Sequence, residues 1–278
     1  MGLRISTNMA SIAAQKKLSG NQRDLQTDFA RLSSGSRITK SADDAAGLAI
    51  SETLKSTIRG YTQAQRNAND GLSMVQVSEG GLSEISNILT RMRELGVQAA
   101  SDTVGDKERG FIDKEVQQLK NEMERIAKTT RWGANQLLDG SGSEYSFQVD
   151  IHNDEFNDRI AFKASEQNAT TSNLGVDSFD YSTKDGAREA LEMLETAQTQ
   201  VNGYRANLGA LQNRLVSTTE NLGNSIENFS AANSRIRDTD VAASTADLAR
   251  NNILQQASVN VLAQANQSSS AALQLLRG

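Results

Sequence analysis

Apolar residues recur at steps of seven along two long stretches of the chain. A stripe sustained over so many heptads is typical of a helix that packs along a neighbouring helix. The pattern predicts one helix over residues 42–99 and another over 187–236, packed against each other as antiparallel partners. The expected core positions are Leu54, Tyr61, Ala68, Val75, Leu82 and Leu89 in the first helix, and Ala187, Leu194, Val201, Leu208, Leu215, Leu222, Phe229 and Ile236 in the second.

A shorter helix and a β-hairpin are predicted between these two stretches. Steps of four and three separate Ile112, Val116, Leu119, Met123 and Ile126, which indicates an amphipathic helix. Residues 145–151 and 160–164 alternate apolar and polar side chains on either side of the polar turn HNDEFND, as a hairpin does. The next residues, SEQNATTSNLGVDSFDYSTKDG, are rich in Ser, Thr, Asn and Asp and predict a surface loop.

Both ends of the chain predict weakly apolar helices, over residues 1–34 and 245–276. No charged residue occurs from Asn251 to Leu276, although amides and serines are frequent. A pair of such helices buries too little apolar surface to offset the ordering of about 70 residues at ~1–2 kcal/mol each. We therefore expect both termini to be mobile in the monomer and to fold on assembly. The expected polymerisation seam consists of Leu25, Phe29, Leu32, Leu254, Val261, Leu262, Leu275 and Leu276.

The stretch RLSSGSRITKSADDAAGLAI, residues 31–50, ends one predicted helix and begins the next. Gly35 can adopt the left-handed conformation that ends a helix. Ser41 is the expected cap of the following helix, with Asp44 in the capping-box position and Asp43 beside it favouring the helix dipole. Gly35, Ser41, Asp43 and Asp44 are therefore expected to form a hinge between a terminal layer and the bundle.

The composition fits long helices and excludes several functions. The 278 residues include no proline and no cysteine, and only 4% are aromatic. Disulfides and thiolate metal sites are thereby excluded, and a thin helical rod is favoured over a thick globular core. A net charge of −5 argues against binding to nucleic acid. No apolar run reaches the ~18 residues of a membrane span, so no membrane insertion is expected, and the opening residues predict no cleavable secretory signal.

Candidate chemistry is sparse. His152 lies among acidic residues in the polar turn, but one imidazole there does not guarantee the convergent ligands of a metal site. The pair Asp43 and Asp44 is better explained by helix capping than by acid catalysis. Motifs of zinc proteases, P-loop enzymes, dinucleotide-binding enzymes and serine hydrolases are missing from the sequence. We expect no catalytic residue, no metal and no cofactor, and a mainly α, self-assembling structural protein.

Several stretches resemble bacterial flagellin. Besides residues 31–50 they are RMRELGVQAA (91–100), TTRWGANQLLDG (129–140), GALQNRLVSTTENLGNSIENFSAANSRIRDTDVA (209–242) and ILQQASVNVLAQANQSSSAALQLLRG (253–278). The resemblance covers roughly residues 1–140 and 187–278. It implies a minimal flagellin, with little or no variable outer domain, that forms the filament used for swimming.

The resemblance also implies a domain organisation. Residues 1–40 and 239–278 would pair as the inner filament core. Residues 41–140 and 184–238 would form the long antiparallel bundle, and 141–183 would hold the β-hairpin and a short variable region.

Partners and location are implied in the same way. The chain would polymerise with itself and meet filament-cap and hook-junction proteins. It would be exported through the flagellar type III channel to an extracellular filament, after a cytoplasmic chaperone had held its C-terminus. Arg91, Leu95 and Glu115 match the surface that the flagellin-sensing Toll-like receptor recognises, and they also suit an inter-subunit contact.

Three alternatives stay open at this point. The nearest is a hook–filament junction protein, which has similar terminal helices but is disfavoured by ADDAAGLAI and by the C-terminal tail. The others are a flagellin with an inserted peptidase, disfavoured by the short middle region, and a soluble adhesin. Sedimentation after addition of filament seeds separates the adhesin from a flagellin.

Overall fold

The computed structural model describes the backbone of residues 7–277 and the side chains up to residue 267. The chain divides into two compact units. The terminal unit comprises the residues up to Ser56 and from Asn228 onward, and the central unit comprises Thr57–Glu227. The helices break near residues 40 and 239, where the sequence predicted domain boundaries. The boundary between the compact units lies elsewhere, within the two long helices, after Ser56 and before Asn228.

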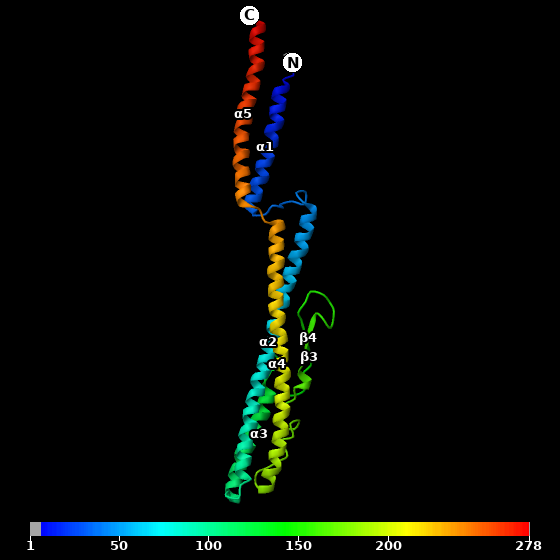
Figure 1. Ribbon diagram of the computed structural model, residues 1–278, viewed down its shortest axis with the longest axis vertical. Helices are drawn as coiled ribbons and strands as arrows, with labels where there is room; N and C mark the ends of the chain where they lie inside the picture. Colours follow the sequence, from blue (N-terminus) through cyan, green and yellow to red (C-terminus); the bar gives the residue numbers. More distant parts are fainter. Residues whose placement is uncertain (1–6, 278) are drawn as a thin grey trace. The chain divides into compact units, whose positions relative to one another are not determined.

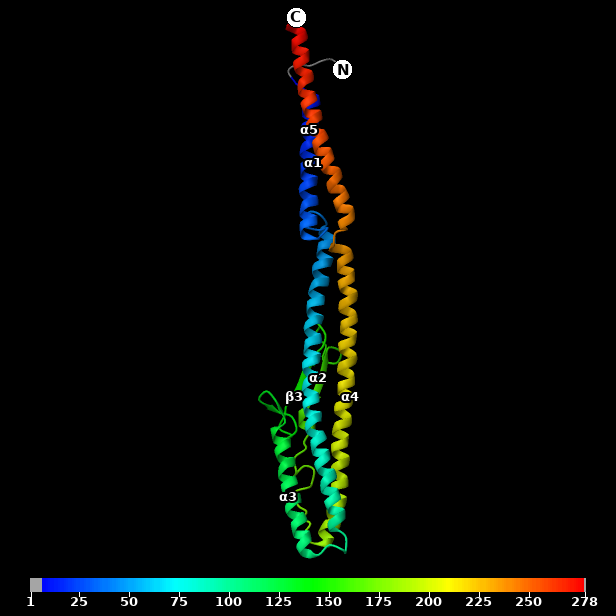
Figure 2. The ribbon, with the colours of Figure 1, turned by 90° about the vertical axis from the view of Figure 1, so that its left-hand side faces the viewer.

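Three helices dominate the central unit. Helices α2 (Ala45–Ala99) and α4 (Lys184–Arg237) run antiparallel and side by side, and the shorter α3 (Asp106–Thr129) lies beside α2 (Figures 1 and 2). Cross-helix hydrogen bonds set the register of α2 and α4. Gln198 donates to the Ser86 hydroxyl at 2.7 Å, and Gln65 donates to the Thr219 carbonyl at 3.3 Å. The predicted mainly α fold with long antiparallel helices is confirmed.

The two heptad stripes form the core of the central unit. Val75, Leu82 and Leu89 on α2 are at most 1% exposed, as are Leu194 and Leu208 on α4. Burying such a side chain stabilises the fold by about 1.5–3 kcal/mol. The expected core positions are therefore confirmed along the middle of both helices, whereas the outermost positions, such as Leu54 and Ile236, are only half-buried.

The predicted hairpin is present, together with a smaller one that was not predicted. Strands β3 (Glu144–Gln148) and β4 (Arg159–Lys163) pair antiparallel, with Phe147 opposite Ile160, and a short 3₁₀ helix, η1 (Ala164–Glu166), follows β4. The additional hairpin joins β1 (Arg131–Trp132) to β2 (Asn135–Gln136). Its turn contains Gly133 at φ 62°, a left-handed conformation that glycine adopts without strain.

The prediction of a surface loop after the hairpin is wrong. Residues 167–181, here called the strap, place five side chains in the core. The five are Ala169, Leu174, Val176, Phe179 and Tyr181, each at most 6% exposed. Their spacing has no helical or strand period, so the many polar residues between them concealed their burial from pattern analysis.

Polar groups of α2 and α3 fasten the strap. The Lys120 ammonium group donates to the carbonyls of Asp177 and Phe179 and lies 3.9 Å from the centre of the Phe179 ring. Burial lowers the pKa of Lys120. The Tyr181 hydroxyl donates to the Met92 carbonyl at 2.8 Å, and burial raises the pKa of that phenol. These bonds compensate for placing irregular backbone against a helical core.

The terminal unit contains two further helices. Helix α1 (Met9–Ser34) and helix α5 (Val241–Arg277) lie side by side in both views (Figures 1 and 2). Helix α5 spans the whole helix expected over residues 245–276. Helix α1 ends where expected but begins at Met9, where the Asn8 side chain caps it, and the first six residues of the expected helix 1–34 lie outside the described residues.

Leu208→Ala should destabilise the central unit by about 2–5 kcal/mol, because it leaves a cavity in a fully buried part of the seam. Urea unfolding of the full chain, followed by the fluorescence of Trp132, the one tryptophan, measures the loss. Val216→Ala, at a position that is 41% exposed, is the matched control and should change stability by less than about 0.5 kcal/mol. Equal losses in the two variants would contradict the assignment of the seam.

Candidate polymerisation surface

Polar contacts align α1 with α5. Asn8 donates to the Ala265 carbonyl at 2.9 Å, and Asn21 donates to the Ser258 hydroxyl at 3.2 Å. Nearer the other end of α1, the Asn251 amide donates to the buried carboxylate of Asp28 at 2.8 Å. The register of this helix pair is therefore set largely by amide and hydroxyl groups.

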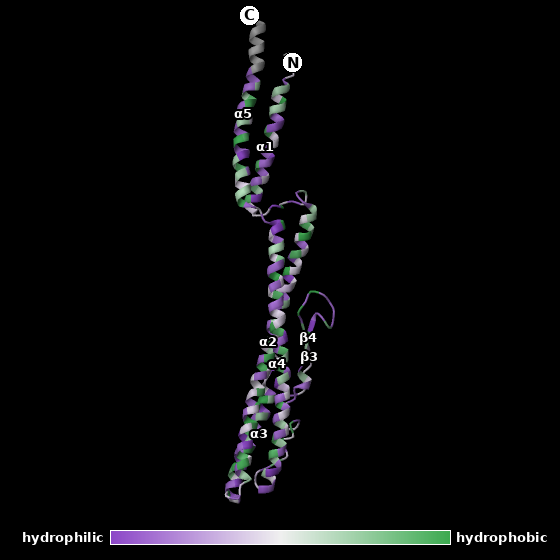
Figure 3. Cartoon of the chain, viewed as in Figure 1, coloured by the Kyte–Doolittle hydropathy of each residue, from purple (hydrophilic) through white to green (hydrophobic). Residues whose placement is uncertain are grey.

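The pair leaves much of its apolar surface uncovered. On α1 and α5, Ala14 and Leu25 are the buried apolar residues among the described side chains. Green hydrophobic and purple hydrophilic positions are interleaved along both helices (Figure 3). Eight large apolar residues on them are at least 43% exposed: Met9, Ile12, Phe29, Val241, Ile253, Leu254, Val259 and Val261. Large contiguous patches of exposed apolar groups are typical of interaction surfaces, so these residues are the candidates for one.

The structure divides the expected seam residues into three groups. Leu25 lies inside the α1–α5 pair, and Leu32 and Leu262 are half-buried. Phe29, Leu254 and Val261 are exposed. The side chains of Leu275 and Leu276 lie outside the described residues. Val241 and Val259 are exposed as well, although the predicted seam does not include them. They could have been found by taking every large apolar residue of the two helices.

Backbone hydrogen bonds fasten the two helix breaks of the terminal unit to each other. The Arg37 amide donates to the Arg237 carbonyl at 2.7 Å, and the Thr239 amide donates to the Gly35 carbonyl at 3.0 Å. The Arg37 guanidinium also donates to the Ile236 carbonyl at 2.8 Å, and Ile38 is only 2% exposed. The segment predicted to be a hinge is therefore held by specific contacts.

The four residues predicted to form a hinge make different local interactions. Gly35 ends α1 with φ 67°, as predicted. Asp43 accepts hydrogen bonds from the amides of Lys40 and Thr39 and from the Thr39 hydroxyl, and these bonds lower its pKa. Their contribution to stability is present above the ordinary carboxyl pKa and is lost as the pH falls through the lowered one.

The prediction that Ser41 caps the second helix is wrong. Helix α2 begins at Ala45, and the Asp44 carboxylate accepts the Gly47 amide at 2.8 Å, so Asp44 is the cap. Asp43 closes a turn with Thr39 and Lys40, and this turn delays the start of the helix past Ser41.

Of the three residues predicted to form the receptor surface, Arg91 and Glu115 are exposed and Leu95 is buried. Arg91 is exposed and pairs with Glu115 at 2.8 Å and with Glu94 at 3.1 Å. Leu95, in contrast, is 3% exposed and belongs to the core of the central unit. Residues four apart on a helix share a face only approximately, and here the boundary between core and solvent falls between them. The exposed patch consists of Arg91, Glu94 and Glu115.

Within the described part of the chain, no three His, Asp or Glu side chains are placed to hold a metal ion. His152 lies in the exposed turn between β3 and β4. None of the described helices is long and apolar enough to cross a membrane.

Comparison with known families and proteins decides the family. The model of the bacterial flagellin N-terminal helical region matches residues 5–143, and that of the C-terminal helical region matches residues 191–276. The flagellin of Halalkalibacterium halodurans is 40% identical over 273 residues, which cover 98% of this chain and 99% of that protein. The chain belongs to the bacterial flagellin family.

Further relatives support a minimal form of flagellin. The flagellin of Bacillus subtilis is 37% identical, and the alignment covers 99% of this chain and 100% of that protein. The alignment with flagellin D of Vibrio cholerae, 32% identical, extends over 376 residues, far more than the 278 of this chain. Between the two family matches only residues 144–190 remain, and they hold the hairpin and the strap.

Among solved structures, the crystal structure of Bacillus cereus flagellin shares 32% identity with a TM-score of 0.50, covering 56% of this chain and 88% of that one. A protein described as hook-associated, from Vibrio parahaemolyticus, reaches a TM-score of 0.58 at 12% identity, which shows a shared fold alone. This flagellin is a structural subunit that self-assembles into the flagellar filament, and it is not an enzyme.

Asp44→Ala should weaken the first turn of α2 by about 1 kcal/mol, because the cap on the Gly47 amide is lost. Amide exchange of Gly47 should then become about fivefold faster, as that free energy implies. Ser41→Ala is the matched control and should leave the exchange of Gly47 unchanged. Faster exchange in Ser41→Ala than in Asp44→Ala would restore Ser41 as the cap.

Proposed function

We propose that the exposed apolar side chains of α1 and α5 form the surface along which flagellin subunits polymerise. The observation that carries this proposal is the combination of a hydrogen-bonded helix pair with eight large exposed apolar residues. Burying one such side chain contributes about 1.5–3 kcal/mol, so several of them can supply the free energy of subunit addition.

The same observation supports ordering on assembly. Few apolar groups are buried between α1 and α5, and each partly buried hydrogen bond between them adds only about 0.5–1.5 kcal/mol of net stability. Packing against neighbouring subunits would add the missing burial. We therefore expect the two helices to open often in the monomer and to become stable in the filament.

Ile253→Ser should raise the critical concentration for polymerisation on filament seeds about tenfold or more, since an apolar contact is lost. Ile253 is 66% exposed, so the unfolding transition of the monomer should not change. Amide exchange in α1 and α5 of the parent protein should slow markedly on polymerisation.

The matched control is Val77→Ser, at a position on α2 that is 38% exposed. It should polymerise like the parent. The proposal fails if Ile253→Ser keeps the critical concentration of the parent, or if α1 and α5 are as protected from exchange in the dilute monomer as in the filament.

The remaining partners belong to this proposal as expectations from the family. Before assembly, the exposed apolar side chains of α5 would be in contact with water. A chaperone that binds the C-terminal segment during type III export would shield them. Filament-cap and hook-junction proteins would meet the same helices at the ends of the polymer.

The patch of Arg91, Glu94 and Glu115 is the remaining candidate for binding of the flagellin-sensing Toll-like receptor and for an inter-subunit contact. Arg91→Ala should lower receptor signalling by free monomer several-fold, because it removes the group that pairs with both carboxylates. Glu122→Ala, at an exposed position elsewhere on α3, is the control. Unchanged signalling by Arg91→Ala would rule out this patch as the receptor site.

A further inference from the structure

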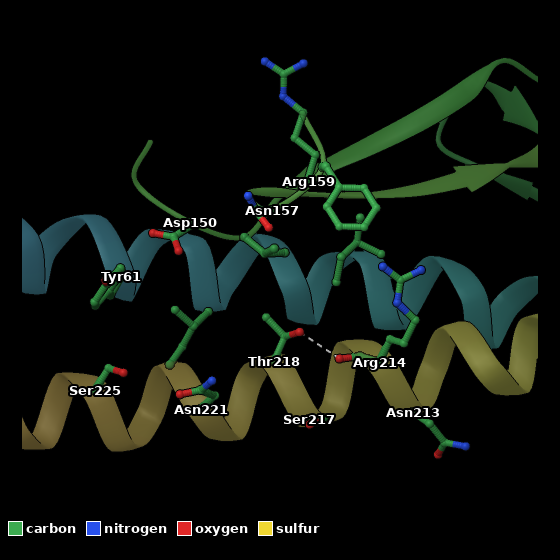
Figure 4. Close-up of a pocket in the computed structure, with 14 residues that line it drawn as sticks. Tyr61, Asp150, Asn157, Arg159, Asn213, Arg214, Ser217, Thr218, Asn221 and Ser225 are labelled. Atoms are coloured by element: carbon green, nitrogen blue, oxygen red, sulfur yellow. Dashed lines mark hydrogen bonds between the residues drawn. The ribbon is translucent and has the colours of Figure 1, made fainter. Parts of the chain in front are cut away.

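A cleft of about 700 Å³ lies between the β3–β4 hairpin and the helices α2 and α4 (Figure 4). Tyr61 lines it from α2, and Asp150 and Arg159 line it from the hairpin. Arg214 and Asn221 line it from α4. Phe156, in the loop between β3 and β4, also borders the cleft and is 89% exposed.

Two guanidinium groups at this cleft have no carboxylate partner among the described side chains. Arg159 donates to the side-chain oxygens of Gln148 and Asn153, at 3.3 and 2.6 Å, and both acceptors are neutral. Among the described residues, no hydrogen bond or ion pair engages the Arg214 guanidinium, which extends from α4 toward the hairpin in Figure 4. Asp150 is occupied locally, since it accepts the Ile151 amide at 2.6 Å.

Another part of α4 has the opposite charge. Asp185, Glu189, Glu192 and Glu195 are all exposed and are here called the acidic ridge. Glu189 and Glu192 are three residues apart and so share a face of the helix, and neither pairs with a cation among the described side chains. The ion pairs of Asp185 and Glu195 are long, with Arg188 at 3.9 Å and with Arg93 at 3.7 Å respectively.

The ridge and the cleft cannot meet within one chain. Glu192 and Arg214 lie on the same continuous helix, and at ~1.5 Å per residue they are about 33 Å apart. Their charges can be paired only between two molecules. A contact between two different patches of one protein is heterologous, and its repetition produces an open polymer rather than a closed dimer.

We propose that the cleft receives the acidic ridge of a second copy of this chain, with that copy's Glu189 and Glu192 beside Arg159 and Arg214. This inference rests on the polymerisation proposed above and adds a second contact, made by the central unit. The exposed ring of Phe156 borders the cleft, where the incoming helix would cover it.

Charge reversal tests the contact. Arg214→Glu and Glu192→Arg, each alone, should raise the critical concentration on filament seeds at least about tenfold, because like charges would face each other across the contact. The double variant Arg214→Glu/Glu192→Arg restores opposite charges at every contact and should return the critical concentration to within about threefold of the parent value. Lys107→Glu makes the same change in net charge as Arg214→Glu and should polymerise like the parent.

Polymerisation of Arg214→Glu at the critical concentration of the parent would overturn the inference, as would a double variant no better than either single one. Neither result would affect the proposed role of α1 and α5, which Ile253→Ser tests separately. Urea unfolding of each variant monomer is the folding control. A midpoint equal to that of the parent shows that the loss of polymerisation does not come from a loss of stability.

Cross-linking gives an independent readout. The chain has no native cysteine, so Arg214→Cys/Glu192→Cys offers the only two thiols. A short bis-maleimide cannot bridge about 33 Å within one helix, but it should link neighbouring subunits of the polymer into a ladder of covalent multimers. Arg214→Cys/Lys107→Cys is the control pair and should give no ladder. The inference is wrong if both pairs give the same pattern.

Discussion

The burial of two heptad stripes against each other is the interaction on which the rest of the central unit depends. Val75 and Leu82 on α2, and Leu194 and Leu208 on α4, exclude water along one face of each helix. This holds α2 and α4 in a defined antiparallel register, against which α3, the hairpin and the strap can pack. The cleft at Arg214 and the acidic ridge both lie outside this seam, the cleft beneath the hairpin and the ridge on exposed positions of α4.

The terminal unit is organised by a different balance of forces. Amides and hydroxyls set the register of α1 and α5, and the two helix breaks are fastened through Gly35, Arg37 and Thr239. Hydrogen bonds of this kind specify geometry but contribute only about 0.5–1.5 kcal/mol each. Apolar groups such as Ile253 and Val259 remain exposed. Under the polymerisation proposed for these helices, the apolar burial that the monomer lacks would come from neighbouring subunits.

Regular parts of this flagellin were predictable, and irregular parts were not. The heptads located three helices, and the alternation around HNDEFND located the β3–β4 hairpin. The strap was missed because the burial of Phe179 and Tyr181 depends on Lys120 of α3 and on Met92 of α2, both far away in the sequence. Ser41 was chosen as a cap from its spacing, but the hydrogen bonds of Asp43 moved the helix start to Ala45. Leu95 was placed on a surface because periodicity alone does not locate the edge of a core.

Residue identity and local periodicity were enough to assign the family and the mainly helical fold, because family motifs and heptads can be read along the chain without knowing what packs against them. Three features could be seen only in the folded chain: the exposed apolar residues of α1 and α5, the Asp44 cap of α2, and the grouping of charges at the cleft and at the acidic ridge. Arg159 and Arg214 are distant in the chain and share one cleft only because the hairpin folds back beside α4. Such proximity depends on packing between distant segments, which local spacing does not encode.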